Sequence, residues 1–433
     1  MFGYLKKFLV PGTVFFLVVS LQSQSLTQLS AIKTNGSIFA VKVQGDYLYF
    51  VDFRGSSSMF KTADVSDPTN PAVLDSFFTA GLIADFDVNG DFAYLAMADN
   101  EFGLRILDIS DPTDIAEISF LQGGEKFGTF FQDSTLYLAD GGGLSVFDAT
   151  RPDTLVFDWF FNSNNFGDGI DAFVFADRVY LPVNNTGLFI IDKTTHTLLS
   201  TVPSPAPSIG VAAKQDVAFF TDDALGLVAV NVANARNPVP VDTLAGNGNF
   251  GGDVVLQGSH AFFCDGQNGL RVIDVSEPTH LNETTSFVTG NIFAIRVARQ
   301  DSIIYLASGD LDAGTNFFNG IFLLKNDFST AVRGEDVLPP KKFVLRQNFP
   351  NPFNPSTSIN FRLRKRSKMA LRIYDVTGQE VRKLADRFFS AGVHAMVWDG
   401  KDNLGRSAAS GVYFYQLTDH ENNVQSKRML LLK

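Results

Sequence analysis

The segment GLRILDISDP, residues 103–112, is the clearest copy of a strand that returns along the chain. Further copies read GLSVFDATRP (143–152), GLFIIDK (187–193), GLVAVNV (226–232) and GLRVIDVSEP (269–278). Each copy opens with glycine, which relieves the backbone where a loop enters a strand. The apolar run then ends in Asp or Asn, which starts a turn through local side-chain bonds. The pattern predicts one strand of a repeated β unit.

An aromatic residue marks the apolar run that precedes each such strand. These anchors are Tyr49, Tyr94, Tyr137, Tyr180, Phe219, Phe262 and Tyr305, spaced 45, 43, 43, 39, 43 and 43 residues apart. Inner strands can be assigned near residues 38–43, 84–88, 126–131, 171–176, 209–214, 252–257 and 292–297. Four short strands in each unit of about forty residues are typical of a β-propeller blade. We therefore predict an all-β fold with a seven-bladed β-propeller over residues 26–328.

The last blade lacks an outer strand of its own. Outer strands follow six of the seven blades, and no such strand follows residue 326. The segment LTQLSAIK, residues 26–33, precedes the first inner strand and has an outer-strand pattern. We predict that this segment closes blade seven, because closure removes open sheet edges that invite aggregation.

The GLRILDISDP-type strands resemble the LVIVD repeat family, which occurs in exported and cell-surface proteins. The resemblance covers about residues 37–326. The Trp-Asp and Gly-His marks of WD repeats are absent from this stretch. The resemblance implies an exported propeller and leaves its ligand open.

The N-terminus has the pattern of a secretory signal peptide. Lys6 and Lys7 precede an apolar stretch over residues 8–21, and a small polar run follows. Residues 1–25 are therefore predicted to be a signal peptide. No other segment is long and apolar enough for a transmembrane helix, so we expect none after the signal is removed.

The charge is divided unevenly along the 433 residues. Residues 341–433 hold 17 Lys and Arg against 7 Asp and Glu, whereas the first 340 residues hold 18 against 39. The net charge of −11 thus combines +10 and −21. This asymmetry predicts two domains, and the acidic propeller argues against a nucleic-acid partner. A single cysteine, Cys264, excludes an intramolecular disulfide.

A different module follows a predicted linker over residues 329–342. It opens with FVLRQNFPNPFNPSTSINFRL (343–363), where Asn-Pro repeats forbid helix and favour an extended entry. The module, residues 343–433, resembles the type A sorting domain of the bacterial type IX secretion system, a small Ig-like β-sandwich related to the FlgD hook-capping domain. The matching motif residues are Asn348, Pro350, Asn351, Pro352, Phe353, Asn354, Pro355, Trp398, Asp399, Gly400, Gly411 and Tyr413.

The resemblance implies that secretion machinery is a partner of this module. The basic run RLRKRSK, residues 362–368, has two interpretations. It is either a solvated hairpin or a contact for export machinery or an anionic outer-membrane glycolipid.

No motif predicts catalysis, a cofactor or a metal. The five histidines are scattered without HxH or HExxH spacing. DFDVNGD, residues 85–91, imitates the start of a calcium loop, but the distal Glu is missing and a hairpin explains it. We predict no catalytic residue, no metal and no cofactor.

A polar residue comes three to five positions after each aromatic anchor. These residues are Asp52, Asp99, Asp140, Asn184, Asp222, Asp265 and Asp310. They open the loop between the second and third strands, on one face of the predicted ring. They are candidates for a glycan- or cation-binding face, although Asp and Asn also start turns without any ligand.

The sequence thus predicts a secreted or cell-surface protein, associated with the outer membrane of a Gram-negative bacterium. We expect its propeller to bind a polymer, glycan or protein ligand. Two alternatives stay open: an extracellular hydrolase or lyase with carboxylates as acid and base, and a structural surface component.

Overall fold

The computed structural model describes most of the chain after residue 24. The described residues are 25–99, 101–152, 154–163, 168–246, 252–289, 293–309, 319–328, 343–345, 348, 351, 353–363, 367–389, 392–419 and 423–432. The predicted signal peptide, except Ser25, and the predicted linker 329–342 lie outside them. Within these ranges every regular element is a β-strand, and no helix is long and apolar enough to cross a membrane. The chain divides between Ala331 and Val332 into two compact units.

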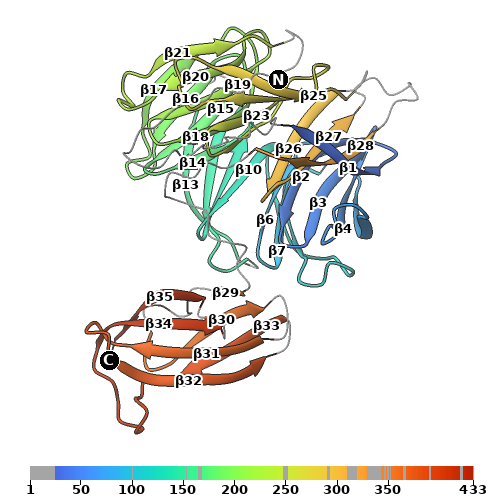
Figure 1. Ribbon diagram of the computed structural model, residues 1–433. Helices are drawn as coiled ribbons and strands as arrows, with labels where there is room; N and C mark the ends of the chain where they lie inside the picture. Colours follow the sequence, from blue (N-terminus) through green and yellow to red (C-terminus); the bar gives the residue numbers. More distant parts are fainter. Residues whose placement is uncertain are drawn as a thin grey trace, which may run out of the picture. The chain divides into compact units, whose positions relative to one another are not determined.

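The described part of the first unit contains seven four-stranded antiparallel sheets, which we call blades (Figure 1). Their first strands are β2 (Ser37–Gln44), β6 (Ile83–Asn89), β10 (Lys126–Gln132), β14 (Phe173–Phe175), β18 (Ser208–Lys214), β22 (Val254–Gln257) and β26 (Phe293–Gln300). The second strands are β3 (Tyr47–Arg54), β7 (Phe92–Met97), β11 (Thr135–Asp140), β15 (Arg178–Val183), β19 (Val217–Asp222), β23 (His260–Cys264) and β27 (Ile303–Gly309).

The third strands are β4 (Ser57–Asp64), β8 (Gly103–Asp108), β12 (Gly143–Asp148), β16 (Gly187–Asp192), β20 (Gly226–Asn231), β24 (Leu270–Asp274) and β28 (Gly320–Asn326). Five of the seven third strands begin at the repeated Gly-Leu pair, whereas β4 and β28 lack it. The outer strands are β5 (Ala72–Thr79), β9 (Ala116–Gln122), β13 (Val156–Asn162), β17 (Leu198–Pro203), β21 (Val239–Leu244), β25 (Asn282–Phe287) and β1 (Leu26–Lys33). The predicted all-β propeller class is confirmed.

The aromatic anchors lie on the second strands and fill the space between blades. Tyr49 and Phe60 of the first blade share a buried cluster with Phe86 of the second. The rings of Phe60 and Phe86 are 5.0 Å apart and meet edge to face. Second strands are buried on both faces because a blade packs against neighbours on both sides, which explains their continuous apolar runs.

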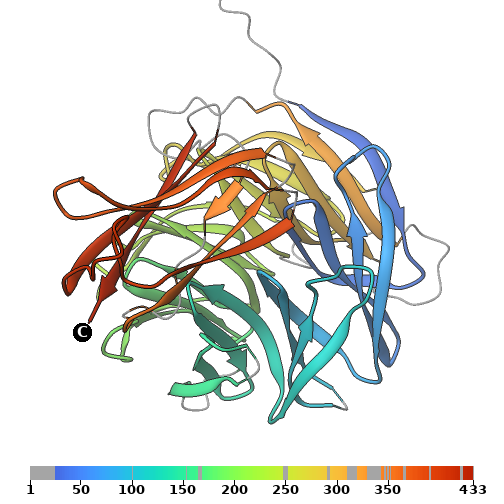
Figure 2. The same ribbon diagram turned by 90° about the horizontal axis from the view of Figure 1, so that it is seen from below.

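Strand β1 pairs antiparallel with β28, from Leu26 opposite Asn326 to Lys33 opposite Gly320. Figure 2 shows the blue N-terminal strands beside the orange strands that precede the second unit. Each first strand contacts the first strand of the next blade, and β26 contacts β2. The blades therefore follow one another around a common axis, with the ends of the first unit side by side.

Glutamine side chains fasten neighbouring hairpins. The amide of Gln44 donates to the Gly90 carbonyl at 2.7 Å and accepts from the Gly90 N–H at 2.9 Å. Gln300 makes the same pair of bonds with Gly45, at 2.7 and 3.0 Å. The second clasp joins the last blade to the first, so it fastens the closure itself.

The second unit is a small β-sandwich. One sheet has the order β29 (Phe343–Leu345), β30 (Thr357–Leu363) and β33 (Gly392–Trp398). The other has the order β32 (Glu380–Phe389), β31 (Ser367–Tyr374), β34 (Gly411–Asp419) and β35 (Val424–Leu431). The predicted β-sandwich after the propeller is confirmed, and its core is centred on fully buried Trp398.

Deleting residues 26–33 should lower the melting temperature of the propeller and promote association. The deletion leaves β28 with unpaired N–H and C=O groups and removes apolar contacts, a loss on the order of several kcal/mol. Differential scanning calorimetry measures the transition. Removing residues 341–433 is the control and should barely change it, whereas unaltered melting after loss of 26–33 would mean that the ring closes another way.

Candidate functional site

Charged side chains gather at two levels along the axis, on the first strands or one to two residues before them. In each blade, the first-strand residue that pairs with the aromatic anchor of the second strand defines the anchor level. The residue two positions earlier in the sequence defines the upper level. The upper level reads Ala40, Asp85, Gly128, Asp171, Gly210, Asp253 and Arg296 around the ring. The anchor level adds Lys42 opposite Tyr49 and Asp87 opposite Tyr94. We call the six charged residues of the two levels the axial cluster.

Glycine alternates with aspartate at the upper level for a steric reason. A Cβ on Gly128 would lie 2.7 Å from the Asp171 Cα, and one on Gly210 would lie 2.9 Å from the Asp253 Cα. The backbone that carries each of these aspartates therefore presses against the blade before it. A side chain at either glycine would push the neighbouring strand outward.

Three carboxylates of the axial cluster fasten their blade to the next one. The Thr129 N–H donates to Asp85 at 2.9 Å, and the Phe131 N–H donates to Asp87 at 2.8 Å. The Val297 N–H donates to Asp253 at 3.3 Å. These bonds satisfy backbone groups at the inner edge of a blade, which no ladder partner reaches.

Lys42 supplies positive charge against these carboxylates. Burial alone would lower the pKa of the Lys42 ammonium, but attraction by Asp87, Asp85, Asp171 and Asp253 outweighs burial and raises it. Burial raises the pKa of Asp87, and Lys42 only partly offsets that rise. Lys42 therefore stays charged, and the potential around it is negative.

The predicted polar ring lies at the ends of the second strands, but most of its members are engaged within their own blades. Asp52, Asp140, Asp222 and Asp265 are buried. Asn184 is half-buried and Asp99 is exposed. Asp310 lies outside the described residues.

The partners of the buried carboxylates come mainly from the third strand of the same blade. Lys61 pairs with Asp52 at 2.7 Å, and Arg271 pairs with Asp265 at 2.7 Å. The Ser145 hydroxyl donates to Asp140 at 2.6 Å. Sequence reasoning missed these partners, although the third residue of copies such as GLR and GLS marks their position.

Asp222 differs from the other three carboxylates in its partners. It accepts hydrogen bonds from the Ser204 hydroxyl and from the N–H groups of Ala224 and Leu225, at 2.7 and 2.6 Å for the latter two. Such bonds hold the loop after β19 in shape. The turn-forming role weighed in the sequence analysis therefore describes its geometry well.

The described part of the chain gives little support for a metal site or for a reactive cysteine. No group of three or more His, Cys, Asp or Glu among these residues is placed to hold a metal ion. Cys264 is fully buried, and burial raises the pKa of its thiol well above the ordinary value. A thiol in that state is a poor nucleophile.

The asparagines of the C-terminal motif anchor the entry of the second unit. The N–H of buried Asn348 donates to the Tyr415 hydroxyl at 2.8 Å, and its side-chain amide donates to Thr357 at 3.0 Å. The Asn351 side chain accepts from the Leu430 N–H at 2.8 Å. Pro350 and Pro352 lie outside the described residues.

Phe353 continues this attachment along the edge strand β35. Its N–H donates to the Leu430 carbonyl at 3.0 Å, and its carbonyl accepts from Leu432 at 2.9 Å. Its ring packs 5.5 Å from that of Trp398. The Asn-Pro segment that contains Phe353, Asn354 and Pro355 therefore lies against the outer edge of β35.

The remaining motif residues lie at the end of β33, in the turn that follows it, and on β34. The Trp398 ring N–H donates to the Lys401 carbonyl at 2.9 Å, and Asp399 accepts from the Lys401 N–H at 3.2 Å. Gly400 has a φ of +71°, and a Cβ there would lie 2.8 Å from the Pro355 carbonyl oxygen. Gly411 starts β34, on which Tyr413 packs 5.1 Å from the Trp398 ring.

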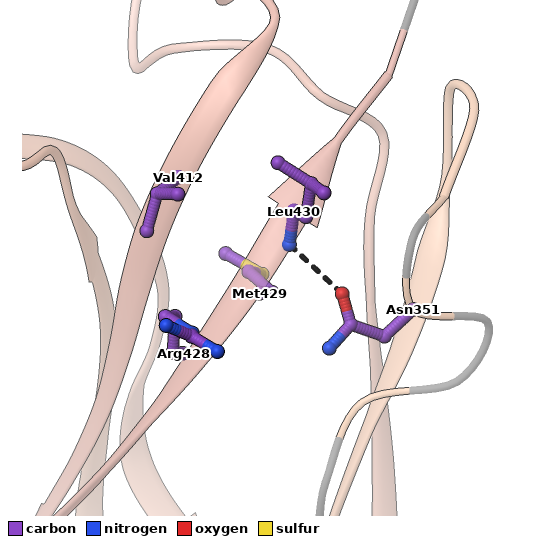
Figure 3. A pocket seen from close by; sticks show the side chains of 5 residues that line it. All are labelled: Asn351, Val412, Arg428, Met429 and Leu430. Carbon is purple, nitrogen blue, oxygen red and sulfur yellow. Dashed lines mark hydrogen bonds between the residues drawn. The ribbon is translucent and has the colours of Figure 1, made fainter.

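A pocket lies beside this attachment (Figure 3). Asn351, Val412, Arg428, Met429 and Leu430 line it. Its lining is mostly apolar, with the Asn351 amide engaged by Leu430. The pocket has no cluster of acid, base or nucleophile that would indicate catalysis.

Two family models match parts of the chain. The LVIVD repeat matches residues 35–79, 80–120 and 251–289. The FlgD Ig-like domain matches residues 351–422. LVIVD repeats and a FlgD Ig-like domain are therefore present in this chain. No curated protein sequence matches it.

Among solved structures the chain is similar to PorZ of Porphyromonas gingivalis, described as an essential bacterial surface component of the type-IX secretion system. The TM-score is 0.50 at 14% identity, over 99% of this chain and 62% of PorZ. This chain thus spans less than two thirds of PorZ, and the likeness shows the fold. The computationally designed protein Ika8 has a TM-score of 0.48 at 9% identity, over 86% of this chain and 99% of Ika8.

Replacing Asp52 by Asn should destabilise the first blade at neutral pH by about 1–3 kcal/mol, because Lys61 and Arg54 lose a buried partner. Burial raises the pKa of Asp52, but hydrogen bonds from Arg54 and Lys61 outweigh burial and lower it. A carboxyl whose pKa is lowered by folding stabilises the fold at pH values above its ordinary pKa of 3.8. This stabilisation is lost as the pH falls below 3.8 and through the lowered pKa of the folded chain.

Urea denaturation of the full chain at pH 7 and at pH 3 measures this effect. The deficit of Asp52→Asn should shrink at the lower pH. Exposed Asp99→Asn is the matched control and should stay within about 0.5 kcal/mol of the natural chain. Equal stability of Asp52→Asn and the natural chain at pH 7 would contradict the role given to this ion pair.

Proposed function

We propose that this chain is an exported propeller that reaches the cell surface or the medium and binds a polymer, glycan or protein ligand there. The observation that carries the proposal is the union of LVIVD repeats with a C-terminal FlgD Ig-like domain in one chain. The fold likeness to PorZ, a surface component of its own secretion system, agrees with that location.

We further propose that residues 343–433 act as a sorting module of the type IX secretion system. The Asn-Pro segment and the turn after Trp398 are built into one folded sandwich, so the motif residues support a compact recognition unit. The net charge of +10 over residues 341–433 would favour an acidic surface on the export machinery.

A chain ending at Asp336 should fold but accumulate in the periplasm, because it lacks the module. Cell fractionation and surface proteolysis measure the distribution. A periplasmic reporter fused to residues 343–433 is the complementary arm and should move to the surface. Equal surface delivery with and without the module would remove the sorting proposal.

We propose that the ligand engages the loop face that follows the second strands. Exposed Asp99 and half-buried Asn184 are the accessible members of the predicted polar ring. The buried members would act by holding the loops of that face in shape. Their hydrogen bonds and ion pairs, within a blade or, for Asp222, also to the segment after β17, support a preformed surface, which lowers the entropy cost of binding.

Replacing Asp99 and Asn184 together by Ala should weaken ligand capture about tenfold, because polar contacts are lost. Pull-down of cell-envelope glycans and proteins with the purified mature protein measures capture. Asp46→Ala is the matched control, since Asp46 is exposed in the hairpin at the other end of the first blade. Equal loss in both variants would argue against the loop face.

The hydrolase or lyase alternative has one observation in its favour. Burial, followed by repulsion from Asp85 and Asp253, raises the pKa of Asp171 to about 7. A carboxylic acid that keeps its proton near neutral pH, beside other carboxylates, suits acid–base catalysis. Release of soluble sugar or uronate products during the same incubation would favour this alternative. Capture without products favours binding or a structural role.

A further inference from the structure

Three carboxylates stand at one level around the propeller axis. Asp85, Asp171 and Asp253 occupy the upper level of the second, fourth and sixth blades. The cations of the axial cluster, Arg296 and Lys42, belong to β26 and β2, which are neighbours in the ring. Positive charge is therefore concentrated on one side of the axis, and negative charge is spread around it.

Asp171 differs from the other two upper-level carboxylates in its partners. Asp85 and Asp253 accept an N–H from the following blade, at 2.9 and 3.3 Å. Asp171 accepts from the N–H of Ala172, its own neighbour in sequence, at 2.7 Å. Among the described residues, the Ala172 N–H is the donor to the Asp171 carboxylate. No hydrogen bond from another blade therefore stabilises the negative charge of Asp171.

The strands that pack against β14 bring no charge to the level of Asp171. That level is occupied by Gly128 on β10 and by Gly210 on β18. The ionisable side chains of those strands lie elsewhere: Lys126 pairs with Asp140, and Lys214 bonds to the Gly258 carbonyl.

We propose that Asp171 is a proton-binding site at the propeller axis, and that its ionisation weakens the closed ring. The proton converts the carboxylate to a neutral acid and removes one of three like charges from the upper level. The inter-blade bonds of Asp85 and Asp253 then hold the ring without the repulsion that an ionised Asp171 would exert on each of these two carboxylates.

Electrostatics agree with this geometry. Asp171 is half-buried, and the loss of hydration at this position raises its pKa to about 7, with repulsion by Asp85 and Asp253 added. Attraction by Lys42 and Arg296 opposes these effects without cancelling them. Asp87 acts on the same network through Lys42.

The sign of the pH dependence follows from linkage. The folded chain holds a proton on Asp171 up to about pH 7, whereas an unfolded carboxyl loses it near 3.8. The folded state therefore binds more protons across this window, and stability is lost as pH rises through it. Above about pH 7 no further loss arises from this group, so mild acid tightens the ring.

The test compares the natural mature chain with Asp171→Asn, which carries a neutral side chain of the same shape. The melting-temperature advantage of the variant should grow between about pH 4 and pH 7, reach about 5 °C, and stay constant at higher pH. Asp99→Asn is the matched control and should follow the natural chain at every pH. Parallel curves for Asp171→Asn and the natural chain would overturn the proposal.

Proton release gives a readout that a merely structural change would not move. Unfolding at pH 5.5, followed with an indicator dye, should release about one more proton from the natural chain than from Asp171→Asn. If that variant does not fold, Lys42→Gln decides, because loss of the ammonium should move the proton-release window to higher pH. An unmoved window, or equal proton release, would contradict the assignment.

Discussion

The pairing of β1 with β28 is the constraint on which the rest of the propeller depends. A blade buries both faces only when it has a neighbour on each side, and the last blade gains its neighbour through β26 and β2. The clasp between Gln300 and Gly45 lies at the same junction and fixes the relative height of the two strands. Without this junction two apolar faces and a row of peptide groups would meet water.

Closure also creates the electrostatics of the axis. First strands that are far apart in sequence meet around one line, so Lys42 and Asp253 act on each other across the whole unit. Three carboxylates near the axis join neighbouring blades, because backbone N–H groups of the next blade donate hydrogen bonds to Asp85, Asp87 and Asp253. Asp171 lacks such a bond, and its charge stays responsive to pH.

In the second unit, the open edge of the sheet at β35 is covered by residues of the Asn-Pro segment, whereas the propeller closes into a ring. Asn351 and Phe353 bond to the outer edge of β35, and Asn348 is buried against Tyr415 and Thr357. The Asn-Pro segment thus has a folding role in addition to any recognition role. Its asparagines supply donors and acceptors where proline removes backbone N–H groups.

The sequence by itself determined the strand order, the blade repeat and the change of domain, because local strand and turn preferences recur with a fixed period. It also marked the ends of the second strands, where Asp52 and Asp140 lie. Only the tertiary structure decided what those residues do. Their partners Lys61 and Ser145 come from another strand of the same blade. Because the carboxylates are buried, these pairs stabilise the blade. The axial cluster was likewise invisible, since Lys42, Asp171 and Arg296 meet only when the ring closes, and their charges interact through space.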